Sequence, residues 1–351
     1  ARAIPVVYDV DVVVVGGSTG AVAAATQAAR GGAKVFLLTS RQYLGEDVCA
    51  TMRLWTEPGE TGAGPAARSL LGEPSPRTPM DLKRRLDEAL LAAGVEFLYG
   101  CYPTDVLRDP SGNPAGIVMA NRCGRQAVRA KVIVDATARA AVARLAGARF
   151  RPYPAGKLAF RWIVVGGRPR PGDDCSVRPL DETPAGHTAF EYILSIPMPD
   201  SSFGSFADAE QVARDRTFHP DKTDSSECLF QVPPDAMYGQ QTFSGAGPSV
   251  EKIDLDVFRP AGVGRVYALG GCADVDRVVA EELVRPAALI DAGLRVGKAA
   301  ADEARGLARP ESVAVAGESP EAEPVPGDVR ELLSGLRPTL WSLPAVESPA
   351  R

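Results

Sequence analysis

The stretch that most constrains this chain is residues 11–39, DVVVVGGSTGAVAAATQAARGGAKVFLLT. An uninterrupted apolar run at 12–15 is typical of a parallel strand that is buried on both faces. Glycines crowd the turn that follows, and an Ala-rich run at 21–30 has the composition of a helix packed close to a sheet. A second apolar run begins at residue 35. Strand, Gly-rich turn, helix and strand in this order predict the first βαβ unit of a dinucleotide-binding sheet.

The turn after the first strand has the pattern of a phosphate-binding loop. Measured against G-x-G-x-x-G, Gly16 takes the first place, Ser18 the second and Ala21 the third. Such a turn directs backbone N–H groups and the positive end of a helix at a pyrophosphate. The β-carbon of Ser18 is expected to intrude on that approach, and Thr39 stands where an acidic residue usually holds the ribose. An ordinary βαβ unit that keeps its glycines for packing is the alternative.

Composition limits the classes of function. The chain has 351 residues, enough for two or three domains, and its net charge of −5 argues against a general nucleic-acid binder. No apolar run approaches the roughly 20 residues of a membrane span. The first residues, ARAIPVVYDV, lack the apolar core of a signal peptide. We therefore expect a cytoplasmic protein, or an exported one whose leader has been removed.

The cysteines and histidines do not form a metal pattern. Six cysteines are scattered without a C-x-x-C pair, and the two histidines are His187 and His219. Clustered thiols or paired imidazoles are what zinc and iron sites require. The sequence predicts no metal site.

Beyond the first unit, a helix and a short strand precede a change of pattern. Thr78 and Pro79 have the residue types of a helix start, and Gly94 ends the apolar stripe that follows. Residues 95–99 read as a strand. Between 101 and 128, short strands alternate with the turns DPSGNP and RCGR, which predicts a β-meander.

The meander leads into another buried strand, KVIVD at 131–135, followed by Ala136 and Thr137. With the βαβ unit, this arrangement resembles FAD-dependent oxidoreductases of the glutathione-reductase-type flavoprotein fold. The resemblance also rests on YLGEDVCATM, GVEFLYG, VYALGGCADVD and RPAALIDAGLRVGKAAA. It implies an α/β fold with a Rossmann-like FAD-binding domain and FAD as cofactor. In related flavoproteins two such domains follow one another in one polypeptide, so the chain resembles the first half of a pair.

The motifs and the resemblance together give a set of candidate site residues. Those expected to contact FAD are Gly16, Gly17, Ser18, Thr19, Gly20, Thr39, Ser40, Arg41, Gly45, Glu46, Asp47, Val106, Ala136, Thr137, Gly270 and Asp274. Cys49, which the resemblance places beside the flavin ring, is the candidate catalytic residue. A small buried thiol without a chemical role is the alternative reading of Cys49.

The predicted domains follow from these segments. Residues 1–150 and 258–305 form the FAD-binding domain, and 151–257 form an inserted mixed α/β substrate domain. Pocket candidates in the insert are Arg161, Trp162, His187, Tyr192 and His219. Residues 306–351 are rich in Pro, Glu, Ser and Ala. They predict either an arm that docks on its own domain or on a neighbouring subunit, with Trp341 as anchor, or a linker to another domain.

Two functions remain open at this point. The first is an FAD-dependent oxidoreductase that transfers hydride from a small organic substrate to the flavin. The second is a subunit with a degenerate cofactor site that serves as structural or regulatory partner of an active flavoprotein. The second reading rests on positions that depart from the family's usual residues, namely Ser18, Thr39, Glu46, Ala138 and Gly271. Either reading predicts an oligomer or a partner subunit.

Overall fold

The computed structural model describes residues 4–55, 64–72, 78–180, 188–244 and 253–315. The chain divides into two compact parts, 1–314 and 315–351, and the account below concerns the first. Nearly all of the predicted arm, including Trp341, lies outside the described residues, as does His187.

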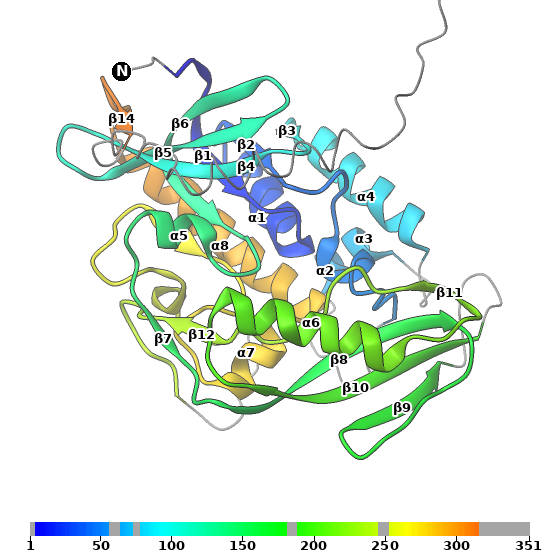
Figure 1. The fold of residues 1–351 in the computed structure, drawn as a ribbon. Coiled ribbons are helices and arrows are strands. Elements are labelled where there is room, and N and C mark those ends of the chain that lie inside the picture. Colours follow the sequence, from blue (N-terminus) through cyan, green and yellow to red (C-terminus); the bar gives the residue numbers. More distant parts are fainter. Residues whose placement is uncertain (1–3, 56–63, 73–77, 181–187, 245–252, 316–351) are drawn as a thin grey trace, which may run out of the picture. The chain divides into compact units, whose positions relative to one another are not determined.

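The larger sheet combines parallel strands with an antiparallel meander, which confirms the predicted fold class (Figure 1). Its strands are β1 (Val6–Val15), β2 (Val35–Leu38), β3 (Glu96–Leu98), β4 (Tyr102–Arg108), β5 (Pro114–Asn121), β6 (Gly124–Asp135) and β13 (Val266–Ala268), and β14 (Ala314–Val315) follows at the boundary of the first part. Strands β3, β2, β1, β6 and β13 run parallel in that order. The meander β4-β5-β6 is antiparallel, and β6 is one continuous strand where the sequence suggested two.

Apolar side chains of β1 alternate between the two faces of this sheet. Val12 and Val14 belong to the core shared with the helices. Val13 and Val15 belong to the core on the opposite face, with side chains of the meander and of α5. The continuous apolar run in the sequence therefore reflects burial on both faces, as predicted.

Helices cover the larger sheet, and the helix at 79–92 begins at Pro79 with Thr78 as its N-cap, as predicted. They are α1 (Thr19–Arg30), α2 (Glu46–Cys49), α3 (Pro65–Leu71), α4 (Pro79–Ala92), α5 (Ala141–Leu145), η2 (Leu255–Phe258), α7 (Arg277–Leu283) and α8 (Pro286–Gly306). A β-carbon on Gly293 of α8 would lie 2.3 Å from the Gly20 carbonyl oxygen, and one on Gly297 would lie 2.2 Å from that of Ala24. Helices α1 and α8 thus pack backbone to backbone.

A second sheet holds four strands in the order β11-β8-β10-β9. These are β8 (Gly156–Gly166), β9 (Cys175–Leu180), β10 (Ala189–Met198) and β11 (Lys222–Ser225). Helix α6 (Phe203–Thr217) crosses one face of it (Figure 1) and packs Ala209 and Ala213 into its core. Trp162 and Tyr192 are buried in this core and line neither of the cavities described below. A short pair, β7 (Phe150–Pro152) and β12 (Asp235–Met237), stands apart.

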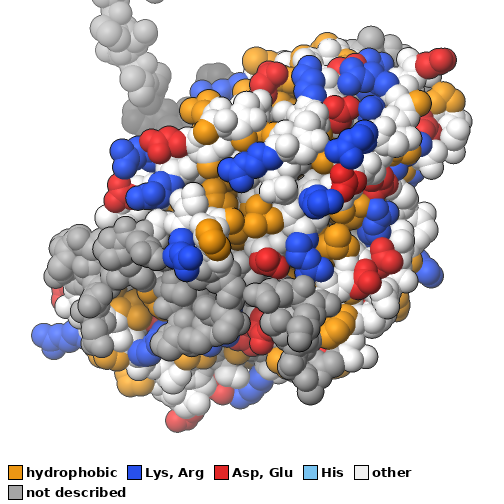
Figure 2. Space-filling model, turned by 180° about the vertical axis from the view of Figure 1, so that it is seen from behind, with side chains coloured by type: hydrophobic (Ala, Val, Ile, Leu, Met, Phe, Trp, Pro, Cys, Tyr) orange, Lys and Arg blue, Asp and Glu red, His pale blue; other side chains and the backbone are white. Residues whose placement is uncertain are grey.

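The surface carries both signs of charge. On the face shown in Figure 2, Lys and Arg side chains are interspersed with Asp and Glu. No helix within the described residues is long and apolar enough to span a membrane. The same residues contain no group of three His, Cys, Asp or Glu side chains arranged to hold a metal ion.

Candidate flavin site

The turn between β1 and α1 is built by close backbone contact. Gly16 has φ +126°, and a β-carbon there would lie 2.4 Å from the carbonyl oxygen of Ala136. A β-carbon on Gly17 would lie 2.6 Å from Thr39 Oγ1. Both glycines are therefore required by the packing of the turn itself. Thr39 is buried and its hydroxyl accepts from the N–H of Arg41 at 3.3 Å, so it faces the turn as a structural group.

Ser18 has a role that the sequence pattern did not suggest. Its hydroxyl is the N-cap of α1 and accepts a hydrogen bond from the N–H of Ala21 at 3.1 Å. Such a cap stabilises a helix by about 1 kcal/mol. The side chain expected to obstruct the site is instead turned onto the helix end, while Ser18 still lines the cavity beside it.

Two consecutive carboxyl groups approach this helix end from α2. Asp47 Oδ1 accepts from the Thr19 N–H at 2.9 Å, and Asp47 Oδ2 accepts from the Thr19 hydroxyl at 2.6 Å. Burial raises the pKa of Asp47, and these hydrogen bonds partly offset the rise. Burial and the neighbouring Asp47 raise the pKa of Glu46, against the effect of Arg41, whose Nε lies 3.4 Å from the Glu46 carboxylate.

The segment after β6 closes the opposite side. Asp135 is fully buried and accepts from the N–H and hydroxyl of Thr137 at 3.0 and 2.6 Å and from the Ala143 N–H at 2.8 Å. Burial raises the pKa of Asp135 despite these bonds. The Thr137 hydroxyl in turn accepts from the Ala141 N–H at 2.7 Å. Thr137 thereby fixes the turn into α5 at the edge of the cavity.

A cavity of about 340 Å³ lies between these elements, within the usual size of small-molecule sites. Seven of the predicted FAD contacts line it: Ser18, Arg41, Glu46, Asp47, Ala136, Thr137 and Gly270. The remaining lining residues are Thr51, Ala138, Arg139, Phe203, Phe206, Glu210, Cys228, Leu229, Phe230, Gln231, Leu269, Gly271, Val284 and Leu289. The aromatic side chains of the lining all come from residues 203–230, a part of the sequence without a recognisable motif. Arg139 lies two positions after Thr137, so the Ala-Thr motif could have indicated it as a site residue.

Other predicted contacts are not among the residues that line this cavity. They include Gly16, Gly17, Thr19, Gly20 and Gly45, although Thr19 is hydrogen-bonded to Asp47, which does line it. Thr39 faces the turn, and Ser40 is exposed. Val106 is buried in the core of the meander.

Asp274 and Cys49 are each held by other parts of the protein. Asp274 accepts from the Gly239 N–H at 2.7 Å and pairs with Arg151. The Cys49 thiol is buried against the Pro79 carbonyl oxygen at 3.8 Å, and burial raises its pKa to about 12. Its placement supports the small buried thiol and gives no support to a catalytic role.

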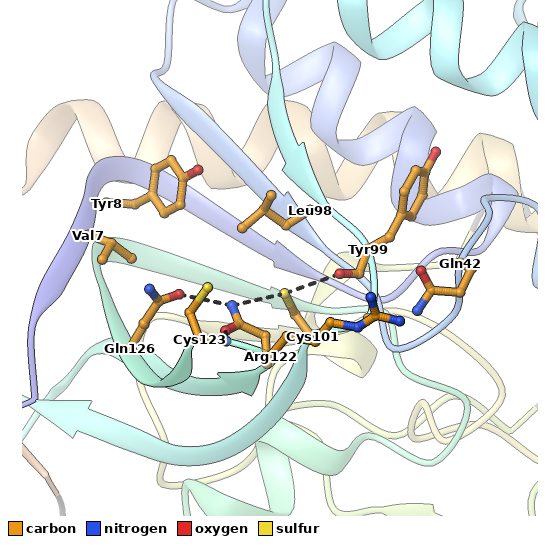
Figure 3. Close-up of a pocket in the computed structure, with 11 residues that line it drawn as sticks. Val7, Tyr8, Gln42, Leu98, Tyr99, Cys101, Arg122, Cys123 and Gln126 are labelled. Atoms are coloured by element: carbon orange, nitrogen blue, oxygen red, sulfur yellow. Dashed lines mark hydrogen bonds between the residues drawn. The ribbon is translucent and has the colours of Figure 1, made fainter. Parts of the chain in front are cut away.

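A second cavity of about 510 Å³ is lined by residues of β1, β3 and the β5–β6 turn and contains none of the predicted site residues (Figure 3). The Asn121 amide donates to the Gln126 side-chain oxygen at 2.9 Å and to the Cys101 thiol at 3.6 Å. The backbone N–H of Cys123 donates to Asn121. These bonds pair part of the polar lining of the second cavity within the protein.

Comparison with known proteins agrees with this geometry. Residues 11–152 match the model of the FAD dependent oxidoreductase family. This part of the chain is similar to that family, which uses FAD as its cofactor. A search of curated proteins finds no match.

Solved structures share the fold at low identity. BexE, studied for oxidation during BE-7585A biosynthesis, is 17% identical with a TM-score of 0.57, over 86% of this chain and 64% of its own. A geranylgeranyl bacteriochlorophyll reductase-like protein from Thermoplasma acidophilum is 15% identical with a TM-score of 0.53, over 85% and 79%. A triple mutant of the flavin-dependent brominase Bmp2 is 14% identical with a TM-score of 0.53, over 95% and 86%. The chain spans 56% of the length of CabE, an aromatic hydroxylase, and 64% of that of BexE.

The first cavity offers an accessible stretch of backbone and unsatisfied polar groups to a ligand. Gly270 has φ +152°, and a β-carbon there would meet nothing within 4 Å, so its backbone is accessible to a ligand. Gln231 Oε1 and Arg139 Nε are buried atoms without a hydrogen-bond partner among the described residues, and both residues line the cavity. A ligand with donors and acceptors would satisfy them.

Proposed function

We propose that the first cavity holds FAD and that the chain oxidises or reduces a small organic molecule there. The observation that carries this proposal is the meeting of the α1 N-terminus, the turn at 136–139 and Gly270 around one cavity. An anionic diphosphate is favoured at a helix N-terminus by free N–H groups and the helix dipole. The backbone at Ser18, Ala138 and Gly270 would hold the cofactor.

The bound flavin would supply hydride transfer, and the protein would bind, orient and exclude water. Phe203, Phe206 and Phe230 provide an apolar wall suited to a planar organic substrate. Glu210 and Arg139 stand on the same lining and would orient polar substituents or exchange a proton with the substrate. The similar structures include a reductase-like protein and a flavin-dependent brominase. The proposed reaction is transfer of hydride between a small organic substrate and the flavin.

A partner subunit with a weakened cofactor site is the second candidate. It is favoured by one observation, the Asp47 carboxylate that already accepts the Thr19 N–H at the α1 N-terminus. In that case the protein would bind no flavin under any condition.

The visible spectrum of the purified chain distinguishes the two. We expect flavin absorption that co-elutes with the protein after incubation with excess FAD and gel filtration. Ala138→Trp should weaken retention, because Ala138 is exposed and lines the cavity. Ala207→Trp, on the exposed face of α6, is the matched control and should retain FAD. A protein that stays colourless at every FAD concentration contradicts the proposal.

A further inference from the structure

The N-terminus of α1 already holds an anion supplied by the protein. Asp47 accepts both the Thr19 N–H and the Thr19 hydroxyl, across 28 positions of sequence. Ser18 accepts from Ala21 in the same turn. The helix end that a diphosphate would approach is thus paired with a carboxylate and a hydroxyl.

The charged groups around Asp47 do not fully neutralise the negative charge of its carboxylate. Its neighbour on α2 is Glu46, a second carboxylate. From the segment after β2, Arg41 pairs with Glu46 at 3.4 Å and with Glu227. The other titratable residues of the lining are Arg139 from the turn after β6, Glu210 from α6 and Cys228.

We propose that the Asp47 carboxylate competes with the diphosphate of FAD for Thr19, and that Asp47 thereby sets the affinity of the site for FAD. This inference rests on the proposed function, since it assumes that FAD binds in the first cavity. Two anions cannot share one donor pair without strong repulsion in a water-poor cavity. Binding of FAD then requires Asp47 either to take up a proton or to leave the helix end.

The affinity should consequently depend on pH in one direction. Burial keeps the pKa of Asp47 above its ordinary value, so the neutral form persists to higher pH than in an exposed aspartate. Below that pKa the competitor is uncharged and FAD binds freely. Above it, uptake of one proton per FAD lowers the affinity by roughly tenfold per pH unit.

The test measures the dissociation constant of FAD by calorimetry or flavin fluorescence from pH 5 to 8, with the full chain. Wild type should bind progressively more weakly as pH rises. Asp47→Asn should bind at least about tenfold more tightly at pH 8 and lose most of the pH dependence, because the amide keeps the size of the side chain without the charge. Asp208→Asn, an exposed site on α6, removes one charge elsewhere and should match wild type.

The outcomes separate the inference from the proposed function. If wild type and Asp47→Asn have equal dissociation constants at every pH, the competition does not exist, although FAD binding stands. If neither protein binds FAD at any pH, the proposed function fails and the inference with it. The pH series on wild type needs no substitution, and circular dichroism of Asp47→Asn checks that the variant is folded.

Discussion

The two sheets of this molecule are stabilised by different kinds of contact. In the larger sheet and its helices, backbone meets backbone at glycines, as where Gly297 of α8 contacts Ala24 of α1. In the four-stranded sheet, the fully buried Glu191 is surrounded by three arginines. Arg53 Nη1 lies 3.0 Å from Glu191 Oε1, Arg178 Nε 3.0 Å from Oε2, and Arg161 Nη1 3.5 Å from Oε1.

The two kinds of contact differ in how far apart their residues lie in the sequence. A glycine contact between helices requires small residues at a regular spacing, and such a spacing can be recognised in the sequence. A buried ion cluster joins residues far apart, here Arg53 beside the flavin site and Glu191 on β10, 138 positions later. The cluster also connects the two sheets, since Arg53 belongs to the segment that continues from α2.

The largest expected effect comes from this cluster. Glu191→Gln should lower the free energy of unfolding by about 3–5 kcal/mol, because removal of the carboxylate leaves the buried Arg53 guanidinium without its counter-charge. Arg53 is only 5% exposed. Urea denaturation followed by circular dichroism gives the measurement.

Glu88→Gln is the control, because Glu88 pairs with Arg84 at 4.0 Å on the exposed face of α4, with both side chains 64% exposed. It should leave the unfolding curve unchanged. Equal effects of the two substitutions would show that the cluster contributes no more than a surface ion pair.

The next effect tests the glycine contacts. Gly297→Ala should destabilise the protein by about 2–4 kcal/mol, since the added methyl group meets a carbonyl oxygen that cannot move without separating α1 from α8. Gly204→Ala on α6 is the matched control, because the nearest atom to its β-carbon, Ser202 Oγ, is 3.7 Å away. There alanine should raise stability by about 0.5 kcal/mol through helix propensity. If both substitutions stabilise, the helices do not pack as closely as described.

The contrast between local and long-range contacts explains which elements could be predicted from the sequence. The strand at 12–15, the helix beginning near residue 19 and the meander were predictable, because periodicity and turn residues act over a few positions. Gly16, Thr137 and Gly270, three of the predicted cofactor contacts, lie just after the ends of β1, β6 and β13. The predicted domain boundaries stay a prediction.

The rest of the site depends on contacts that no local pattern encodes. The aromatic wall at Phe203, Phe206 and Phe230 comes from the insert, and its position relative to α1 follows only from the folded chain. The Ser18 side chain was expected to obstruct the approach of a phosphate, whereas its hydroxyl caps α1. Cys49 was singled out by its neighbours in sequence, yet its side chain turns away from the cavity toward Pro79.

The smallest effect concerns Cys49, in the α2 segment that joins the two sheets. If backbone and charge contacts hold this segment, the thiol matters little. Cys49→Ser should cost about 1 kcal/mol of stability, because a hydroxyl replaces a thiol beside a carbonyl oxygen that it can still reach. The dissociation constant of FAD should not change.

Titration of native protein with a disulfide reagent at pH 8, followed by mass spectrometry, gives a second measurement. The exposed Cys123 should react first and Cys49 last, because a pKa raised to about 12 leaves almost no thiolate. Rapid labelling of Cys49, or loss of FAD binding in Cys49→Ser, would contradict this prediction and indicate that Cys49 contacts the cofactor.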